Sequence, residues 1–423
     1  MATLIPNTMK RTDRESCLAQ IQQLVRTKYY DPQLGGKDWD AVVEQHRAAV
    51  VNAESLEDFE RAANNMLKEL GSGALGLLRG TSKISSRNAI AASFRAVETP
   101  TDGNRWVFQD VAPGGPADRA GIKPGDTLLR IGADEIVPPS KPAFAMGTET
   151  PVVIRPGDGP QAKTITISTP KAKHRDNPAA EPRAVVASVQ DGVGMLKVSL
   201  FPGKHGIDFA RDVTNAIEGE LKYVDALVID LRGNPGGGIG GLRLMSYLTP
   251  DRVPIGYSVG RKLAEAGYDK QRLPRFNRIP KSKWEVPLLA VRYARKKSVV
   301  LETEGLGPQR FHGRVAILVN EHTTCAAEMV ALFAQERGLA TIVGMPTPGR
   351  LVSHRGFNIG HDFTLVVPTG AYVSWGGNRL DGSGITPDVF ADWSRDAVLK
   401  SNDLQLQAAR HAFMGTFSVA SNA

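Results

Sequence analysis

The chain contains little cysteine and no long apolar run. Its 423 residues include only two cysteines, Cys17 and Cys325, which could form at most one bridge, so a disulfide scaffold is excluded. No stretch approaches the roughly 20 apolar residues that a bilayer-spanning helix needs, so we expect no membrane span. The first residues, MATLIPNTMKRTDRES, lack the apolar segment of a secretory signal. A cytoplasmic location is therefore the expectation, or a periplasmic one if a leader has been trimmed.

The net charge of +8 comes from one segment. Residues 261–297 hold twelve Lys or Arg against three Asp or Glu, a surplus of +9, so the rest of the chain sums to about −1. A surplus confined to one insertion is weak support for nucleic-acid binding, and we predict no nucleic-acid partner.

Length and periodicity predict a multidomain α+β chain, because roughly 150 residues per domain gives two or three domains. Helical spacing runs from Asp13 to about Leu78, after which the apolar period changes to two, with a short helix expected around Ala117–Ala120. The predicted parts are a helical N-terminal domain 1–82, a β-rich domain 83–170, a linker 171–184, an α/β core 185–400 that contains the basic insertion 261–297, and a C-terminal helix and tail 401–423.

Strands and helices alternate in the predicted core. Uninterrupted apolar strands are expected in VGMLKVSL, DALVIDLR, RVAILVN and ATIVG, and helices in GIDFARDVTNAIEGELK and CAAEMVALFAQERG. This pattern is typical of a buried, largely parallel sheet covered by helices.

A glycine-rich loop, Gly233–Gly241, lies between a predicted strand and a predicted helix. Its Gly236-x-Gly238-x-x-Gly241 spacing fits a dinucleotide fingerprint, but no strand ending in Asp or Glu lies about 20 residues further on. The loop also lacks the Lys-Ser/Thr of a phosphate-binding P-loop. The remaining interpretations are backbone N–H donors for an oxyanion and an ordinary tight turn. We predict no cofactor and no metal.

The segment Gly256–Gly260, GYSVG, matches the G-x-S-x-G nucleophile elbow around Ser258. That motif needs a strand leading in and a helix leading out. The preceding TPDRVPI contains two prolines, which disfavour a buried strand. An ordinary short edge strand is therefore the preferred interpretation of this segment.

Cys325 follows one predicted strand and begins the next predicted helix. Thr323 or Thr324 is expected to cap this helix, which would place the thiol in its first turn, where free N–H groups and the helix dipole favour a thiolate. Glu328 is expected to complete a capping box. A small buried cysteine is the alternative, but strand ends that meet helix starts are where α/β sheets bind ligands.

A cysteine nucleophile needs a base or a positive neighbour. His322 lies three residues before Cys325 on the strand side, and His354 lies 29 residues after it. Arg350 stays protonated and cannot be a base, although it can hold a thiolate or an oxyanion. The remaining histidines, such as His174, His312 and His361, are expected to be surface or core groups.

Four motifs in one order give the chain its resemblance to a known family. TKYYDPQLGGKDWDAV, AIAASF followed by DVAPGGPADRAGIKPGDTLLRI, DLRGNPGG, and GSGITPDV together resemble the carboxyl-terminal processing proteases, also called tail-specific proteases. These are serine peptidases with a PDZ domain before or within an α/β core. The resemblance implies a PDZ-like domain at 83–170 and a core of the ClpP/crotonase-like tail-specific protease type.

The positions that carry catalysis in the family are changed here. Cys325 stands in place of the nucleophilic serine, Arg350 in place of the lysine base, and His354 in place of a glutamine. Relatives of the tricorn type use a histidine in L-G-D-S-H-T-G, and the corresponding LGSGALG at 70–76 has none. The resemblance therefore leaves Cys325 with His354 as base and Arg350 as positive charge. It also implies an oxyanion hole built from backbone N–H groups of Gly236, Gly237 and Ala326.

The implied activity is a cysteine-dependent peptidase. Its peptide or protein substrate would be captured by adding a strand beside Ile90, Ala91, Ala92, Ser93 and Phe94. The alternatives are a catalytically inactive, peptide-binding pseudopeptidase and a Cys-dependent acyl transferase or ligase. In the resembling fold the basic insertion would flank the cleft and favour acidic peptide segments. The sequence does not determine the oligomeric state, and an oligomer is possible.

Overall fold

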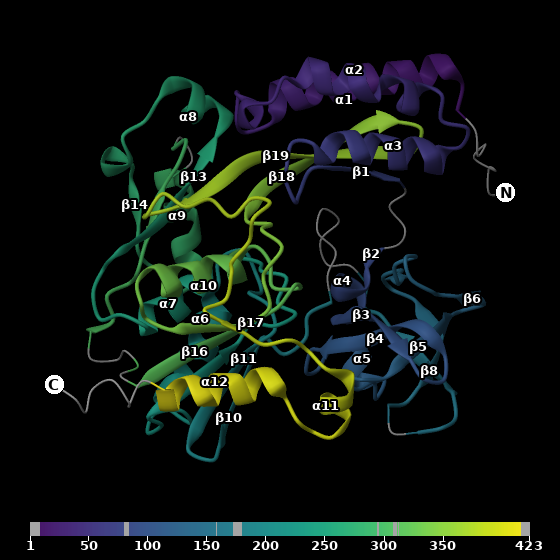
Figure 1. Ribbon diagram of the computed structural model, residues 1–423. Coiled ribbons are helices and arrows are strands. Elements are labelled where there is room, and N and C mark those ends of the chain that lie inside the picture. The colour runs from purple at the N-terminus through teal and green to yellow at the C-terminus, as the bar shows by residue number, and fades with distance from the viewer. Residues whose placement is uncertain are drawn as a thin grey trace.

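The computed structural model describes residues 9–79, 84–157, 159–171, 180–293, 296–307, 311 and 313–415. Most of the predicted linker, with His174, lies outside the described residues, as do His312 and the ends of the chain. Three parts are visible in Figure 1: helices over a curved sheet at the top, a layered α/β body at the lower left, and a β-rich module at the lower right.

The N-terminal helices are α1 (Arg11–Lys28), α2 (Trp39–Val51) and α3 (Leu56–Lys68), with the short η1 (Leu34–Gly36) between the first two. Asp38 caps α2 by accepting from the N–H groups of Asp40 and Ala41, and Ser55 caps α3 by accepting from Asp58 N–H. Apolar residues three and four apart give each helix a buried face, and the three helices share one hydrophobic core with strands of a sheet.

That upper sheet has the order β1–β19–β13–β15–β14, with β18 also paired to β19. Its strands are β1 (Gly76–Arg79), β13 (Pro254–Gly260), β14 (Arg275–Phe276), β15 (Val300–Glu302), β18 (Val352–Gly360) and β19 (Phe363–Ser374). The N-terminal helices and β18 and β19 share one hydrophobic core, in which Phe59 contacts Phe363 at 5.2 Å between ring centroids. The N-terminal segment therefore completes a sheet built mainly from the second half of the chain.

The expectation that Ser258 lies in an edge strand is wrong, because β13 pairs with β19 on one side and β15 on the other. Pro254 is tolerated there because it is the first residue of the strand, beside an irregularity in the pairing with β15. A helix, α8 (Arg261–Ala266), does follow. Ser258 is nevertheless in the extended strand, and no nucleophile elbow forms around it.

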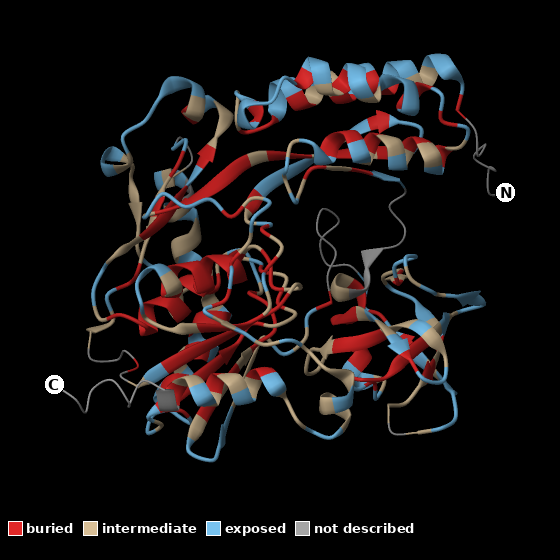
Figure 2. Ribbon diagram, viewed as in Figure 1, coloured by how far each residue is buried: buried red, intermediate tan, exposed pale blue. Residues whose placement is uncertain are grey.

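The lower sheet has the order β10–β11–β12–β16–β17–β20 and is parallel from β11 to β20. Its strands are β10 (Val185–Gln190), β11 (Val193–Val198), β12 (Ala226–Asp230), β16 (Arg314–Val319), β17 (Thr341–Gly344) and β20 (Val389–Phe390). This confirms the prediction of a largely parallel sheet. Figure 2 shows its central strands as mostly buried.

Helices cover both faces of the lower sheet. One face packs against α6 (Ile207–Glu218), α7 (Gly241–Tyr247) and α10 (Ala326–Glu336), and the other against α12 (Leu404–Gly415). Residues of each strand alternate between the two cores: Leu227 and Ile229 of β12 face α6, whereas Val228 faces α12. The loops at the carboxyl ends of these strands form the candidate site.

The β-rich module contains a sheet of order β3–β4–β5–β8–β9, with β6 (Asp134–Glu135) beside β5. The strands are β3 (Ala92–Thr99), β4 (Gly103–Val111), β5 (Thr127–Ile131), β8 (Glu149–Arg155) and β9 (Lys163–Ser168). A separate pair, β2 (Ile84–Ser85) and β7 (Ala143–Phe144), adjoins α4 (Ser86–Ile90). The expected short helix is α5 (Pro116–Arg119). Strand β3 lies at the edge of its sheet.

Candidate active site

Cys325 forms a sharp turn between β16 and α10. Its backbone has φ +55° and ψ −122°, a conformation that costs a residue with a side chain on the order of 1–3 kcal/mol and therefore has to be held by its surroundings. A strained residue between a strand and a helix is the geometry of a nucleophile elbow. The sequence motif pointed to Ser258, whereas the geometry occurs at Cys325.

Cys325 is itself the N-cap residue of α10, so the prediction that Thr323 or Thr324 caps this helix is wrong. The hydroxyl of Thr323 donates instead to the carbonyl of Leu231 at 2.9 Å, and that of Thr324 accepts from Arg87 Nη2 at 2.7 Å. The two threonines thus fasten the turn to the end of β12 and to the β-rich module.

Glu328 holds the turn from within α10. Its carboxylate accepts from Cys325 N–H at 2.9 Å, which confirms the predicted capping-box contact. The same carboxylate accepts from Thr347 Oγ1 at 2.6 Å and from the N–H groups of Gly349 and Arg350 at 2.7 and 2.9 Å. Burial raises the pKa of Glu328, although these hydrogen bonds oppose the shift. Glu328 therefore fixes the segment 347–350 directly beside the thiol.

The thiol of Cys325 is a hydrogen-bond donor in the structure. Its Sγ lies 3.1 Å from the carbonyl oxygen of Arg350 and donates to it. Burial, followed by the nearby Glu328 carboxylate, raises the pKa of the Cys325 thiol, and the positive charges of Arg87 and Arg350 only partly offset this. This shift opposes the thiolate that the helix end is predicted to favour. Nucleophilic attack would require a base to remove the proton.

The glycine loop lies against this turn. A Cβ on Gly236 would be 2.5 Å from Cys325 Cβ and 2.9 Å from Ala326 N, so only glycine fits there. The N–H of Gly236 donates to Asn234 Oδ1 at 2.7 Å. In the part of the chain that the structure describes, the N–H groups of Gly237 and Ala326 have no acceptor. These two amides, one in the glycine loop and one in the residue after Cys325, are available to an anion.

The dinucleotide interpretation of the glycine loop loses its physical basis, because the chain itself occupies the space that these glycines leave. A Cβ on Gly238 would overlap the carbonyl of Gly203, and one on Gly240 would lie 2.6 Å from the ring of Phe209. The small residues permit close backbone approach within the fold.

Arg87 is a site residue that the sequence did not indicate. It lies on α4 of the β-rich module and donates to the carbonyl of His322 as well as to Thr324. Burial lowers the pKa of Arg87 to about 10, with Arg350 acting in the same direction. The contact joins residues more than 230 positions apart, so no local spacing could have revealed it. Arg87 supplies positive charge to Cys325 from another part of the chain.

The residues predicted to bind substrate are buried. Ile90, Ala91, Ala92, Ser93 and Phe94 are all at most 7% exposed. The start of β3 faces the loop before Cys325, where His322 Nε2 lies 3.2 Å from the carbonyl oxygen of Phe94. Ser93 Oγ donates to Asp110 at 2.5 Å, and Asp110 accepts from Asn320 at 2.9 Å. A cavity of about 40 Å³ remains between module and core. This edge of β3 is closed in the structure.

Arg350 precedes β18, and His354 lies near the start of that strand. Arg350 is exposed, with its backbone carbonyl at the thiol, whereas His354 is an exposed residue of β18 paired with Pro368. Among the described residues, no hydrogen bond joins the imidazole to Cys325. The segment 347–350 is also backed by Gly73, whose Cβ position would lie 3.2 Å from the carbonyl of Gly349.

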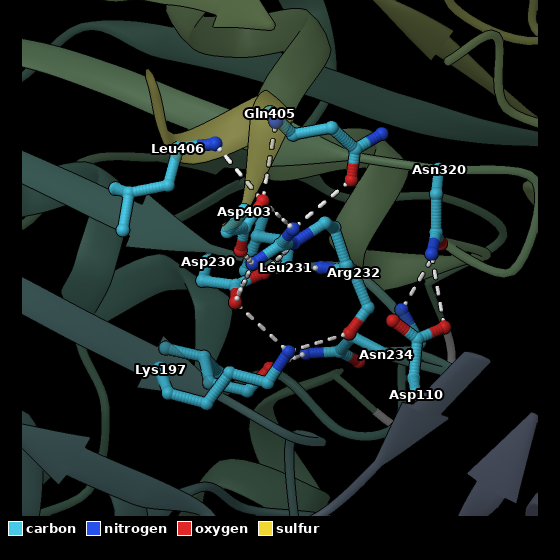
Figure 3. A network of polar contacts seen from close by, with 12 residues as sticks. Asp110, Lys197, Asp230, Leu231, Arg232, Asn234, Asn320, Asp403, Gln405 and Leu406 are labelled. Atoms are coloured by element: carbon cyan, nitrogen blue, oxygen red, sulfur yellow. Dashed lines mark hydrogen bonds and ion pairs between the residues drawn. The ribbon is translucent and has the colours of Figure 1, made fainter. Parts of the chain in front are cut away.

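An ion-pair network anchors the start of the glycine loop (Figure 3). The guanidinium of Arg232 bonds Asp230 at 2.9 Å and Asp403, just before α12, at 2.8 Å, while Lys197 Nζ lies 3.1 Å from Asp230. Burial opposes ionisation of Asp230, but the charges of Arg232 and Lys197 prevail and hold its pKa well below the ordinary 3.8. Arg232 of the DLRGNPGG motif therefore stabilises the fold by holding the start of the glycine loop in place.

Within the described ranges, no group of three His, Cys, Asp or Glu side chains could hold a metal ion. Nor does any described helix combine the length and the apolar character needed to cross a bilayer.

Comparison with known proteins identifies relatives of both the core and the N-terminal helices. Residues 192–390 match Peptidase family S41, and residues 10–68 match the Tricorn protease C1 domain. Putative tricorn protease homolog 2 of Streptomyces coelicolor is 24% identical over 403 residues, which cover 88% of this chain but 30% of that protein. Carboxyl-terminal-processing peptidase 3, chloroplastic, of Arabidopsis thaliana is 24% identical over 404 residues, which cover 90% of this chain and 69% of that one.

A solved structure shares the fold over nearly the whole chain. The photosystem II D1 C-terminal processing protease aligns with a TM-score of 0.51 at 16% identity, covering 95% of this chain and 97% of that one. The mixed α/β architecture with a helical N-terminal region is thus an established fold.

Proposed function

We propose that this chain, whose residues 192–390 match Peptidase family S41, hydrolyses peptide bonds with Cys325 as nucleophile and His354 as general base. The observation that supports this most strongly is the turn at Cys325. A strained strand-to-helix junction carries the thiol, and two amides near it in the chain path, those of Ala326 and of Gly237 in the adjoining glycine loop, have no acceptor among the described residues. Such amides suit the oxyanion that forms during acyl transfer.

The proposed reaction has two stages. Sγ of Cys325 attacks the substrate carbonyl carbon while its proton passes to the His354 imidazole, and the oxyanion accepts hydrogen bonds from Gly237 and Ala326. Collapse breaks the C–N bond, the leaving amine takes the proton from His354, and a thioester remains. Water, deprotonated by the same imidazole, then hydrolyses the thioester and restores the thiol. Gly236 shapes the hole, and Arg350 contributes positive charge beside it.

The base has to approach the thiol during this reaction. Three residues lie between Arg350, whose carbonyl accepts from Cys325, and His354, and the four steps of extended chain from one to the other span about 13 Å. We propose that substrate displaces the Arg350 carbonyl and draws the start of β18 over the thiol. Since a raised thiol pKa keeps Cys325 protonated near neutral pH, the enzyme rests as a neutral thiol and is activated only when the base arrives.

We further propose that the β-rich module is a PDZ-like domain that captures the peptide along β3. The strand lies at the edge of its sheet, where an added peptide strand can hydrogen-bond. The His322 imidazole contacts the Phe94 carbonyl in the structure, so binding of a peptide along β3 requires this contact to break. Acidic substrate segments are expected to be favoured, because Arg350 is exposed beside the thiol. A fall in peptide turnover with rising salt would support that preference.

A pseudopeptidase that binds peptides without cleaving them is the second candidate. It is favoured by one specific observation: the thiol donates to a backbone carbonyl, and no base bonds to it among the described residues. An acyl transferase or ligase would use the same thioester but pass it to an amine.

Thiol labelling and turnover separate these functions. We expect iodoacetamide to modify Cys325 much faster than Cys17, which is 1% exposed, and we expect Cys325→Ala to abolish cleavage of an unfolded protein substrate. His354→Ala should lower turnover with little change in binding, whereas Ser258→Ala, the matched control, should leave turnover unchanged. Binding without turnover in the unmodified chain would establish the pseudopeptidase, and products that incorporate an added amine would establish the ligase.

A further inference from the structure

The basic insertion carries an exposed apolar face. Trp284 in η3 (Lys283–Glu285) is 91% exposed, and Leu288 and Val291 in α9 (Val286–Tyr293) are 73% and 77% exposed. The spacings of four and three residues place these side chains on one side of the helix. Large apolar groups so fully exposed and so close together are a feature of interaction surfaces.

This face is presented by a helix that is anchored from the opposite side. Tyr293 packs its ring against Phe276 of β14 at 5.6 Å between centroids, and its hydroxyl donates to the carbonyl of Arg275 at 2.7 Å. Arg278 pairs with Glu285 at 2.8 Å. In Figure 1, α9 lies beside β14 at the left edge of the upper sheet. The contacts on the inner side leave the outer side without a protein neighbour among the described residues.

Cations flank the helix that carries the apolar face, with exposed lysines before α9 and after it. A hollow of about 750 Å³ behind α9 is lined by seven of them, Arg243, Arg252, Arg275, Arg278, Lys281, Arg292 and Lys296. Three of the seven pair with acids: Arg243 with Glu304, Arg275 with Glu302 and Arg278 with Glu285. The others, and the exposed Lys283 and Lys297 nearby, have no acidic partner in the described part of the chain. The helix therefore presents an apolar outer side, with unpaired cations at its two ends and a positive hollow behind it.

We propose that this face, defined as Trp284, Leu288 and Val291 with the lysines at the two ends of α9, docks the protein on the surface of an anionic lipid bilayer. A short amphipathic helix of this kind lies in the interfacial plane, with Trp and Leu among the acyl chains and Lys and Arg at the headgroups. Each basic residue near an anionic membrane adds attraction, and clusters of four to eight are typical of such surfaces.

The charge distribution favours lipid over a second copy of the chain. A two-fold dimer through this face would bring the same unpaired cations against each other. Stable protein interfaces also use about 20–30 residues a side, whereas the apolar centre here consists of three side chains. A bilayer needs only a few inserted side chains when an anionic surface supplies the rest of the attraction.

Vesicle co-sedimentation of the full chain tests the proposal. We expect binding to phosphatidylcholine vesicles that contain phosphatidylglycerol, weak binding to phosphatidylcholine alone, and release by salt. The triple variant Trp284→Ser, Leu288→Ser, Val291→Ser, and separately Lys281→Glu with Lys296→Glu, should each lower the partition coefficient by on the order of tenfold. Tyr223→Ser removes a side chain that is 86% exposed elsewhere and should change nothing. Because all these residues are exposed, the variants should keep the unfolding midpoint of the parent chain.

Three results would overturn the proposal. The first is equal binding to neutral and anionic vesicles. The second is a parent chain that is dimeric in solution and becomes monomeric in the triple variant, which would assign the face to a second copy. The third is an acidic peptide that binds through Lys281 and Lys296 while anionic vesicles do not, which would assign the basic surface to a protein ligand.

Discussion

Positive charge reaches the Cys325 thiol from two directions. Arg350 lies in the loop after β17. Arg87 comes from α4 of the β-rich module and donates to the carbonyl of His322 and to the hydroxyl of Thr324. Both guanidinium groups lower the pKa of a thiol that burial and Glu328 raise. The reactivity of Cys325 therefore depends on how the module sits against the core.

Replacing Arg87 should make Cys325 less reactive at a given pH. Removing a positive charge raises the thiol pKa further, so the pH dependence of iodoacetamide labelling should shift to higher pH in Arg87→Ala. Arg87→Lys keeps the charge and should restore most of the effect. Arg95→Ala, on β3 but paired with Asp392, is the matched control and should leave the curve in place. An unchanged curve in Arg87→Ala would show that the module does not influence the thiol.

The loops at the carboxyl ends of β12, β16 and β17 form the site together. Their contacts are short and mainly through the backbone: Gly236 touches Cys325, and Glu328 holds Gly349 and Arg350. Because the parallel strands place these ends side by side, the sequence could predict that the glycine loop meets Cys325. It could not predict that the Gly236 amide is already occupied by Asn234, since that depends on the local path of the loop.

A methyl group at position 236 should greatly reduce turnover. We expect Gly236→Ala to lower turnover at least ~100-fold, because the added Cβ would displace Cys325 or the Ala326 amide, and loss of one oxyanion donor alone costs 10²–10³-fold. Gly203→Ala is the control: Gly203 has φ +66°, but no atom lies within 4 Å of its Cβ position. Both variants carry backbone strain, so equal losses of turnover would contradict the role of Gly236 beside the thiol.

The ion pairs of Arg232 should make stability sensitive to acid. The pKa of Asp230 is depressed in the folded chain, so its stabilisation is fully present above its ordinary value of 3.8 and is lost as the pH falls toward the folded value. Arg232→Ala leaves Lys197 as the only remaining cation on the buried Asp230 carboxylate among the described residues and should lower the free energy of unfolding by up to about 3 kcal/mol at neutral pH. Arg211→Ala, which removes an exposed ion pair, should change it by less than about 1 kcal/mol. Urea unfolding at several pH values measures both.

Elements with local signals could be predicted, and those that depend on distant contacts could not. Apolar runs predicted the strands β11, β12, β16 and β17, and the helical period predicted α6 and α10. The prolines before Ser258 suggested an edge strand, because sequence alone does not show that Pro254 only begins β13. The burial of Ile90 to Phe94 and the contact of His322 with Phe94 arise from docking of the module, which leaves no mark in local spacing.

At the scale of the whole molecule, the N-terminal helices and the strands that follow the active-site loops form one structural unit. The helices α1 and α3 contribute to the same core as β18 and β19, and β1 pairs with β19. Strand β18 also carries His354. Changes in the N-terminal helices should therefore alter the site as well as stability.

Truncating one aromatic residue tests whether the N-terminal helices unfold together with the rest of the chain. Phe59→Ala should lower the free energy of unfolding by about 3–5 kcal/mol, because Phe59 is fully buried against Phe363. If the parts unfold together, circular dichroism and exposure of the Cys17 thiol should report the same urea midpoint in the parent and the variant. Leu78→Ala, at a position 55% exposed, should have little effect. Unfolding of the N-terminal helices at a lower urea concentration than the rest of the chain would show that they are a separate folding unit.

The pairing of β1 with β19 also sets an order of events during synthesis. Gly76 lies opposite Val366, so the partner of β1 is translated 290 residues later. At typical rates of 5–20 residues per second, that interval lasts about 15 to 60 s. Throughout it, the newly made N-terminal helices leave the ribosome with their apolar faces uncovered, because the sheet that they cover does not yet exist. Production of this protein should therefore depend on chaperones that shield the first 80 residues until the last strands emerge.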